Sequence, residues 1–223
     1  KQSEQTFIWL DDAEKLGFDE NDENKNINLI NNVGFEPLVI LPGQVNRQNA
    51  ALVAQGIQWL LKKDDVFDLG KLLDKFPGVS RRFEQIIPGL FTDYAHTPPK
   101  IEGALQLAHE VAESNVVVIY EGLHNTRQHF IKDDLKHLFD EVKKLYIVPS
   151  YLAREDENLQ LLSPADLRTL LSPESQAHTE PMQLDDNLKL AIQSHLNNHD
   201  LVLCLTAGGG NSLDEWLRKE FAT

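Results

Sequence analysis

The feature that most constrains this sequence is a regular alternation of short apolar runs and amphipathic stretches after Pro77-Gly78. Residues Val116 to Tyr120 are five apolar residues in a row, which is typical of a strand covered on both faces. Strands that alternate with helices of about 10–15 residues indicate right-handed crossovers and a mostly parallel sheet. We therefore predict an α/β fold with a mostly parallel sheet for this part of the chain.

The expected elements fall into two groups on either side of this Pro-Gly pair. In the first group we predict a strand at 6–10, a solvated loop at 17–32, a strand at 38–41, a helix at 46–63 and a short helix at 67–73. In the second group we predict strands at 83–87, 89–93, 116–120, 145–148 and 201–206, and helices at 98–114, 127–142, 164–171, 185–197 and 212–221. The pair therefore marks a boundary between domains of residues 1–77 and 78–223.

The charge balance limits the partners. The formal net charge is −14, and both nucleic acid and anionic membranes require a basic face, so we exclude them as main partners. A phosphate ligand needs only a few local cations or backbone N–H groups, so it remains compatible. The single cysteine, Cys204, lies in an apolar run and is expected to be a buried thiol. With no signal peptide and no long apolar run, we expect a cytoplasmic protein.

The segment 92–99 brings an acid, a phenol and an imidazole together at the end of a predicted strand. These are Asp93, Tyr94 and His96, and Pro98 behind them suits the first turn of a helix. Ligands bind at the carboxyl ends of strands in open α/β sheets, so these side chains are candidate site residues. The alternative is an Asx-type turn with His96 as a solvated loop residue.

Two further segments carry groups suited to anions. Arg81 and Arg82 offer two guanidinium groups, and arginine is the preferred bidentate partner of phosphate. Their alternative role is a surface ion pair with Glu84. The run Gly208 to Gly210 lies between a strand and a helix, where backbone N–H groups can hold an anion. The alternative there is a tight turn with Ser212 as the helix N-cap.

The loop from His124 to His129 follows the strand at 116–120. The two histidines are five residues apart, a spacing that does not stack them on one helix face, so we predict no metal site. The loop is better interpreted as facing a ligand beside residues 93–97, with Arg127 within it. In the first domain, Asn46 and Asn49 lie three residues apart at the start of a helix. Asn49 could reach a ligand, and the alternative role of Asn46 is the N-cap.

Four motifs occur in one order along the chain. They are Leu-Pro-Gly-x-x-Asn-x-x-Asn at 41–49, Phe-Pro-Gly-Val-Ser-Arg-Arg-Phe-Glu at 76–84, Asp-Tyr-Ala-His-Thr-Pro at 93–98, and the loop at 124–127. In this order they resemble the C-terminal part of the Mur ligases, ATP-dependent enzymes that add amino acids in bacterial peptidoglycan synthesis. The Arg-Arg-Phe-Glu form resembles the UDP-N-acetylmuramate–L-alanine ligases and also the murein-peptide recycling ligases.

The resemblance implies that residues 1–77 are the end of a central ATP-binding domain and that residues 78–223 are a Rossmann-like C-terminal domain. It implies that Asn46 and Asn49 line the nucleotide site. Asp93 and Tyr94 would also lie near the nucleotide, and Arg82 would lie near its terminal phosphates.

The resemblance also implies the reaction. A carboxylate of UDP-N-acetylmuramate is activated by ATP as an acyl-phosphate, with Mg²⁺ neutralising phosphate charge, and the amino group of L-alanine attacks it. His96, His124 and Arg127 would bind the incoming amino acid. Arg82, Asp93 and His96 would be the catalytic residues.

The sequence also departs from the family. It contains no GxxxxGK[ST] phosphate loop and no upstream Glu and His to hold Mg²⁺, so we expect a fragment that does not catalyse the reaction alone. Val45 stands where the family usually has His, and Leu123 and Asn125 stand where it has Pro and a basic residue. The alternatives are a recycling ligase, a non-catalytic Rossmann-like nucleotide-binding module that uses Gly208 to Gly210, and a structural partner subunit with a degenerate site.

Overall fold

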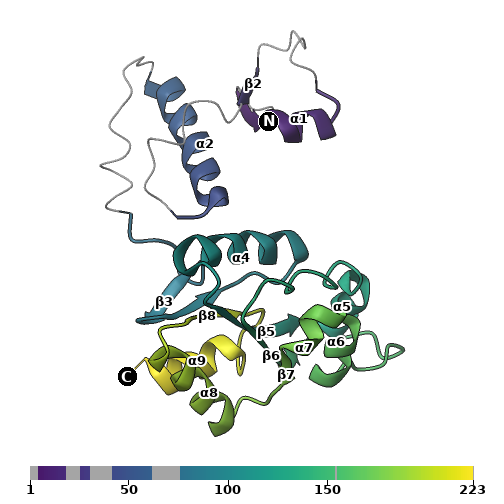
Figure 1. The fold of residues 1–223 in the computed structure, drawn as a ribbon. Helices are drawn as coiled ribbons and strands as arrows, with labels where there is room; N and C mark the ends of the chain where they lie inside the picture. The colour runs from purple at the N-terminus through teal and green to yellow at the C-terminus, as the bar shows by residue number, and fades with distance from the viewer. Residues whose placement is uncertain (1–4, 19–25, 31–41, 62–75, 154, 223) are drawn as a thin grey trace. The chain divides into compact units, whose positions relative to one another are not determined.

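The computed structural model describes residues 5–18, 26–30, 42–61, 76–153 and 155–222. The chain divides into two compact units, Lys1–Pro77 and Gly78–Thr223, and each is described by itself (Figure 1). The predicted strand at 38–41 and the predicted helix at 67–73 lie outside the described residues. Among the described residues, no helix is long and apolar enough to cross a membrane.

The described residues of the first unit form two parallel strands and two helices, in chain order β1 (Thr6–Trp9), α1 (Leu10–Lys15), β2 (Ile27–Ile30) and α2 (Gln44–Leu61). The first strand confirms the one predicted at 6–10. The loop predicted at 17–32 was wrong over its last residues, because β2 lies there and pairs with β1. Its four residues alternate only weakly, and the acidic, Asn-rich segment before them hides the pattern.

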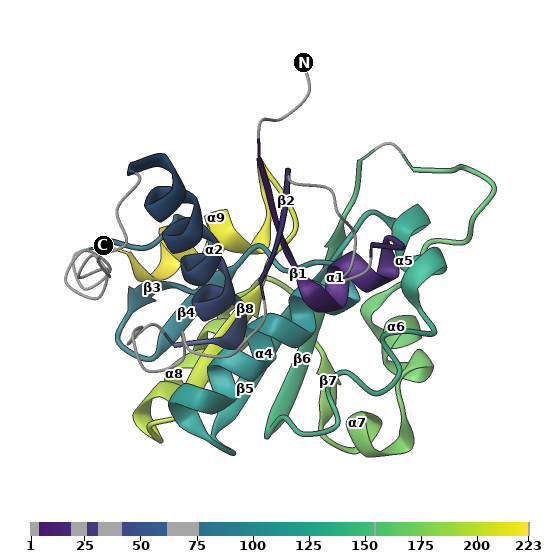
Figure 2. The same cartoon turned by 90° about the horizontal axis from the view of Figure 1, so that it is seen from above.

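The second unit is built on a six-stranded sheet with the spatial order β3-β4-β8-β5-β6-β7 (Figure 2). The strands are β3 (Glu84–Ile87), β4 (Leu90–Asp93), β5 (Val116–Leu123), β6 (Lys144–Tyr151), β7 (Thr179–Pro181) and β8 (Leu201–Leu205). Only β3 is antiparallel to its neighbour in this sheet, which it joins through a turn at Gly89 with φ +84°. The prediction of an α/β fold with a mostly parallel sheet is confirmed.

Helices cover both faces of this sheet (Figure 1). They are α4 (Pro98–Ala112), α5 (Asn125–Ile131), α6 (Pro164–Leu170), α7 (Pro173–Ala177), α8 (Asp186–Asn197) and α9 (Leu213–Phe221). One core places residues of α4 and α6 against Val116, Val118 and Tyr120 of β5. The other places α8 and α9 against Val117 and Ile119. Every side chain of β5 is buried, so its apolar run is explained by helices on both sides.

The helix predicted at 127–142 is confirmed over residues 127–131 and was wrong beyond them. The helix α5 ends at Ile131, and residues 132–141 form consecutive turns in which N–H groups bond to carbonyls three residues back, as Leu138 does to Leu135. Leu135 and Phe139 are buried in the core and lie four apart, so the turns keep a helical spacing of apolar residues without forming an α-helix. The short α7 and β7 were not predicted, because each is too short to show a period.

Cys204 confirms its predicted burial. It lies in β8 within the core formed by α8 and α9, and no part of it is exposed. Burial raises the pKa of its thiol well above the ordinary value. The thiolate is therefore strongly disfavoured, as expected for a cysteine that acts as an apolar core residue.

Candidate functional site

The order of the strands places four loops next to one another at the carboxyl edge of the sheet. β4 ends at Asp93, which pairs with Leu205 of β8, and Leu205 pairs with Tyr120 of β5. β6 is the next strand beyond β5. The segments that follow β4, β8, β5 and β6 therefore leave the sheet side by side, which is where α/β proteins bind ligands.

Asp93 is buried at the end of β4 and is held by the segment that carries the two arginines. Its Oδ2 atom accepts a hydrogen bond from the N–H of Phe83 at 2.8 Å, and its Oδ1 atom is 4.0 Å from Nη1 of Arg82. Burial raises the pKa of the Asp93 carboxyl, while the Phe83 N–H and the Arg82 charge act in the opposite direction. Asp93 is thus a buried acid beside an exposed guanidinium.

Tyr94 joins the two arginines to His96. The Cζ atoms of Arg81 and Arg82 lie 4.6 Å and 5.7 Å from the centre of the Tyr94 ring, within the range of cation–π attraction. Nη1 of Arg82 donates to the Tyr94 carbonyl at 3.1 Å, and the His96 ring meets the Tyr94 ring edge-on at 4.6 Å. These contacts make one cluster of the four side chains.

His96 is only 6% exposed, so the alternative of a solvated loop residue is wrong. Its Nδ1 atom lies 3.2 Å from the carbonyl oxygen of Tyr94, and because a carbonyl only accepts, Nδ1 is the donor. Burial lowers the pKa of His96, and so do the charges of Lys100, Arg127 and Arg82. The imidazole is therefore neutral at pH 7, with the lone pair on Nε2. Arg127, one of these charges, belongs to α5, the helix that follows β5.

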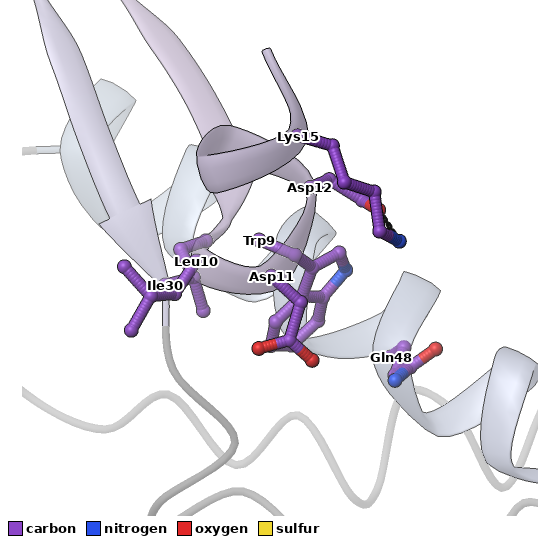
Figure 3. A pocket seen from close by; sticks show the side chains of 7 residues that line it. All are labelled: Trp9, Leu10, Asp11, Asp12, Lys15, Ile30 and Gln48. Carbon is purple, nitrogen blue, oxygen red and sulfur yellow. Dashed lines mark hydrogen bonds and ion pairs between the residues drawn. The ribbon is translucent and has the colours of Figure 1, made fainter. Parts of the chain in front are cut away.

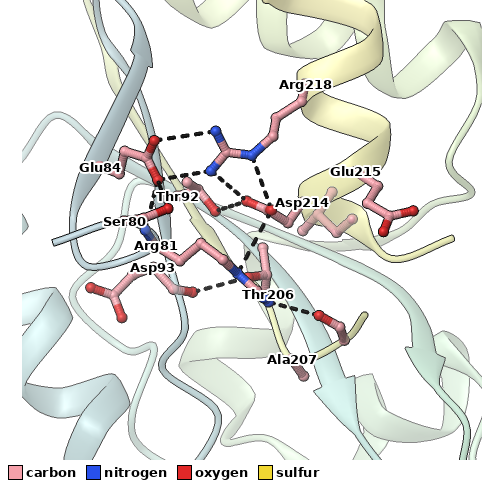
Figure 4. A network of polar contacts seen from close by, with 12 residues as sticks. Ser80, Arg81, Glu84, Thr92, Asp93, Thr206, Ala207, Asp214, Glu215 and Arg218 are labelled. Atoms are coloured by element: carbon pink, nitrogen blue, oxygen red, sulfur yellow. Dashed lines mark hydrogen bonds and ion pairs between the residues drawn. The ribbon is translucent and has the colours of Figure 1, made fainter. Parts of the chain in front are cut away.

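A network of ion pairs joins the segment 80–84 to α9 (Figure 4). Arg218 of α9 donates to both carboxylate oxygens of Glu84, at 3.2 Å and 2.8 Å, and also to Asp214 at 3.1 Å. The hydrogen bonds from Arg218 lower the pKa of Glu84 to about 2. The predicted alternative, a surface ion pair of Arg81 or Arg82 with Glu84, is wrong because the Glu84 carboxylate is bound by the Arg218 side chain.

His124 contacts a different loop. It has φ +49° and precedes the first residue of α5. Its N–H donates to the Tyr151 carbonyl at 2.9 Å, and its Nδ1 atom contacts the Ala153 carbonyl and lies 3.5 Å from Oε1 of Glu155. The structure thus places the His124 ring against the loop after β6. His129 also binds a carbonyl, that of Gln160.

The loop between β8 and α9 is filled by a side chain of the protein itself. Glu121 accepts the N–H of Ala207 at 3.0 Å with Oε2 and the N–H of Leu213 at 2.9 Å with Oε1. On the other side, Nη2 of Arg81 donates to the Gly208 carbonyl at 2.7 Å. Ser212 lies at the N-cap position as expected, but its side chain makes no capping hydrogen bond. Glu121 thus binds N–H groups on either side of Gly208 to Gly210, and phosphate contact at this run stays a prediction.

Sequence reasoning missed Glu121 and the contacts that Glu155 makes. Glu121 continues the apolar strand that was expected to end at Tyr120, and an acid inside a buried run is a signal that could have identified it. Glu155 accepts hydrogen bonds from the N–H of Thr126 at 2.9 Å and the N–H of Ala153 at 2.9 Å, which ties the loops after β5 and β6 together. Nothing in the local sequence indicates that pairing.

The candidate residues Asn46 and Asn49 of the first unit lie on α2, and both are exposed. The helix begins at Gln44, so Asn46 lies within its first turn and the N-cap alternative is wrong. The Asn46 side chain donates to the Pro42 carbonyl at 2.9 Å. Asn49 follows one turn later, and the nucleotide contact of both residues stays a prediction.

Described residues line a cavity in each of the two units. A cavity of about 290 Å³ in the first unit (Figure 3) is lined by Trp9, Leu10, Asp11, Asp12, Lys15, Ile30 and Gln48. A cavity of about 590 Å³ in the second unit is lined by Ser163, Pro164, Ala165, Glu180, Pro181, Met182, Gln183, Asp185 and Asn187. The predicted site residues line neither of them. Within the described ranges, no group of three or more His, Cys, Asp or Glu side chains could hold a metal ion.

Comparison with known proteins relates this arrangement to one group of ligases. No protein-family model matches the chain. The chain is 29% identical over 173 residues to the UDP-N-acetylmuramate–L-alanine ligase of Jannaschia sp. (strain CCS1), a match that covers 75% of this chain and 36% of that protein. It is 28% identical over 191 residues to the ligase of the same name from Agrobacterium fabrum, which covers 82% of this chain and 38% of that protein.

The chain is similar to the Mur ligases. This confirms the resemblance that the four ordered motifs predict. The chain spans less than two-fifths of the length of these two relatives.

Solved structures agree on the fold. The UDP-N-acetylmuramate–alanine ligase of Thermotoga maritima matches with a TM-score of 0.50 and 21% identity, over 81% of this chain and 37% of that one. The folylpolyglutamate synthase of Mycobacterium tuberculosis, solved with ADP and AMPPCP, matches with a TM-score of 0.54 and 13% identity, over 82% of this chain and 41% of that one.

Proposed function

We propose that this chain is the C-terminal part of an ATP-dependent ligase that adds L-alanine to UDP-N-acetylmuramate through an acyl-phosphate. The support is its 29% identity, over 75% of its length, to a ligase so named. In this proposal residues 1–77 end a central ATP-binding domain and residues 78–223 form the C-terminal domain. A cytoplasmic location follows from the use of ATP and a UDP-sugar.

The observation that carries the proposal is the cluster in which the guanidinium groups of Arg81 and Arg82 lie against the Tyr94 ring, which in turn contacts the neutral imidazole of His96. Lys100, Arg127 and Arg82 all act electrostatically on this ring. All three side chains are exposed, and they lie at the carboxyl edge of the sheet. In a protein with a net charge of −14, such a group is a local exception and favours an anionic ligand. Phosphate and carboxylate groups, which the proposed substrates carry, fit it.

Each side chain of the cluster has a task in this proposal. The Arg82 guanidinium binds terminal phosphate oxygens, and its fork suits them. Asp93 holds the segment that carries Arg82, through the Phe83 N–H. Tyr94 offers a ring for stacking beside the nucleotide. In the first unit, Asn46 and Asn49 are the residues proposed to contact a nucleotide. ATP, when bound, supplies the phosphoryl group that activates the carboxylate.

The second half of the reaction requires an uncharged amino group, because an ammonium has no lone pair with which to attack. The Nδ1 proton of His96 is engaged with the Tyr94 carbonyl, so Nε2 is free to accept a proton. The lowered pKa of His96 keeps this atom unprotonated at pH 7. Arg127 binds the carboxylate of the incoming amino acid. His124 contributes to that subsite through the position of its loop.

The Mg²⁺ that the resemblance implies does not fit the described residues, because they hold no suitable group of three or more ligands. The 223 residues also contain no GxxxxGK[ST] segment. We infer that the phosphate loop and the metal ligands belong to other parts of a longer protein, and that this chain is inactive by itself.

Two alternatives differ in what they require. A murein-peptide recycling ligase would use the same cluster with a peptide in place of L-alanine. A non-catalytic nucleotide-binding module would need the loop at Gly208 to Gly210 for phosphate, and Glu121 already binds the N–H groups on either side of that loop, at Ala207 and Leu213. The ligase is therefore the better proposal of the two classes.

The test is ATP-dependent phosphate release by the full-length gene product, given UDP-N-acetylmuramate and each of L-alanine, L-serine and glycine. We expect release with L-alanine. Release with a murein peptide and with none of the amino acids would establish the recycling ligase. A folded protein that releases phosphate with neither class of acceptor would refute the ligase proposal. A Lys136→Ala variant removes an exposed positive charge outside the cluster, and it serves as the charge control for variants of the cluster arginines.

A further inference from the structure

Glu121 is a buried carboxylate near the carboxyl end of a strand that is otherwise apolar. It is 2% exposed, and its two oxygens accept one hydrogen bond each from the N–H groups of Ala207 and Leu213. Leu213 is the first residue of α9, so the carboxylate lies where the helix dipole favours a negative charge. Burial raises the pKa of Glu121, and hydrogen bonds from the N–H groups of Ala207, Leu213 and Gly208 act in the opposite direction. An acid that is costly to bury is therefore retained here by its backbone donors.

The carbonyl side of the same loop carries Arg81. The Gly208 carbonyl accepts a hydrogen bond from Nη2 of Arg81 at 2.7 Å, and Nε of Arg81 lies 3.7 Å from Oδ2 of Asp214. The guanidinium that makes these contacts stacks on Tyr94 at 4.6 Å. The loop thus connects Glu121 on one side to Arg81 on the other, and Arg81 packs on the candidate site residue Tyr94.

A third contact leaves the loop little freedom. A Cβ atom at Gly208 would lie 2.5 Å from Cδ2 of Tyr151 and 2.7 Å from Cβ of Ser212. Real Cβ atoms do not approach other atoms so closely, which means that the Tyr151 ring rests directly on the Gly208 backbone. Any shift of the loop would therefore be transmitted to both Tyr151 and Arg81.

We propose that Glu121 is a positioning residue that acts as a built-in anion for the loop between β8 and α9. Its carboxylate binds the N–H groups that would otherwise attract an anion from solution, and it thereby fixes the Gly208 carbonyl that orients Arg81 on Tyr94. This inference does not depend on the ligase activity. It concerns how the residues of this chain hold one another, and it assigns the loop a structural anion in place of a ligand.

The test uses chemical rescue of the 223-residue chain. Glu121→Ala leaves space for a small carboxylate and removes the charge, so we expect a lower midpoint of urea unfolding and altered amide NMR signals of Gly208 and Leu213. The ring-current shift that Tyr94 imposes on the side chain of Arg81 should also be lost. Added acetate should restore the midpoint and these signals with saturation. Glu121→Gln fills the same space without charge, so it should show the altered signals and should not respond to acetate.

A matched control removes a carboxylate elsewhere. Glu180 pairs with Lys144 at 2.9 Å and is about half exposed, and Glu180→Ala should leave the Arg81 signals in place with or without acetate. Unchanged Arg81 and Gly208 signals in Glu121→Gln would overturn the proposal, and this variant decides the matter if Glu121→Ala does not fold. A saturable shift of the Gly208 and Leu213 amides of the unmodified chain on addition of inorganic phosphate would also overturn it, because the loop would then accept an external anion.

Discussion

Replacement of Gly208 by alanine is a sharp test of how the loop between β8 and α9 is packed. Gly208 does not have a positive φ, so alanine introduces no backbone strain there. The cost comes from the new methyl group, which would lie 2.5 Å from the Tyr151 ring and 2.7 Å from Cβ of Ser212. Overpacking of this kind costs about 1–3 kcal/mol. We expect a loss in that range in the free energy of unfolding.

The neighbouring glycine provides the control. At Gly210 a Cβ atom would have no heavy atom within 4 Å, and φ is not positive, so Gly210→Ala should be neutral or should stabilise by about 0.4–1 kcal/mol. Urea unfolding of both variants measures the difference. In a Tyr151→Ala background, Gly208→Ala should cost less, although the contact with Ser212 remains. Equal costs in the two backgrounds, or equal effects at Gly208 and Gly210, would refute the packing argument.

Three further predictions concern charge. In Arg218→Ala the pKa of Glu84 should rise from about 2 toward its ordinary 4.5. In the unmodified chain this ion pair adds stability above pH 4.5 that is lost as the pH falls toward 2. Urea unfolding measured at several pH values should show that this pH-dependent stability is absent from the variant. Lys100→Ala should raise the pKa of His96, because it removes a repelling charge. NMR titration of the imidazole measures this pKa. An unchanged or lower pKa in the variant would show that the Lys100 charge does not act on His96. In the full-length protein, Arg82→Ala should lower turnover about 100-fold with a stability change within about 0.5 kcal/mol, since the side chain is exposed; activity equal to that of the charge control would exclude its phosphate role.

Most of the sheet could be predicted from the sequence, because every strand of it except β7 carries a local signal. The run Val116 to Tyr120 is apolar throughout, and the helices around it repeat their apolar residues with the proper period. The turns at 132–141 could not be predicted, because Leu135 and Phe139 satisfy a helical period while neighbouring N–H groups, such as that of Leu138, bond to carbonyls three residues back. Periodicity reports which side chains are buried, and it does not distinguish an α-helix from successive turns that bury the same ones.

Part of the candidate site could likewise be predicted from the sequence, and part could not. Asp93, Tyr94 and His96 are adjacent in sequence and end a strand, so their common position follows from the pattern. The pairing of Glu121 with the N–H of Leu213 joins residues 92 positions apart. It depends on β8 lying beside β5, which is a property of the strand order and not of either segment. For the same reason the burial of His96 was not expected.

The strand order has a consequence for the time at which this unit can form. β8 is the last strand to be synthesised, yet it lies between β4 and β5, which are completed about a hundred residues and about eighty residues before it. Until Leu201–Leu205 has been synthesised, β4 and β5 have no common neighbour, and each has an unpaired edge where β8 will lie. Unpaired edges invite association with other chains, and long-range pairing of this kind slows folding. A nascent chain that pauses before residue 201 would therefore be the state most in need of a chaperone.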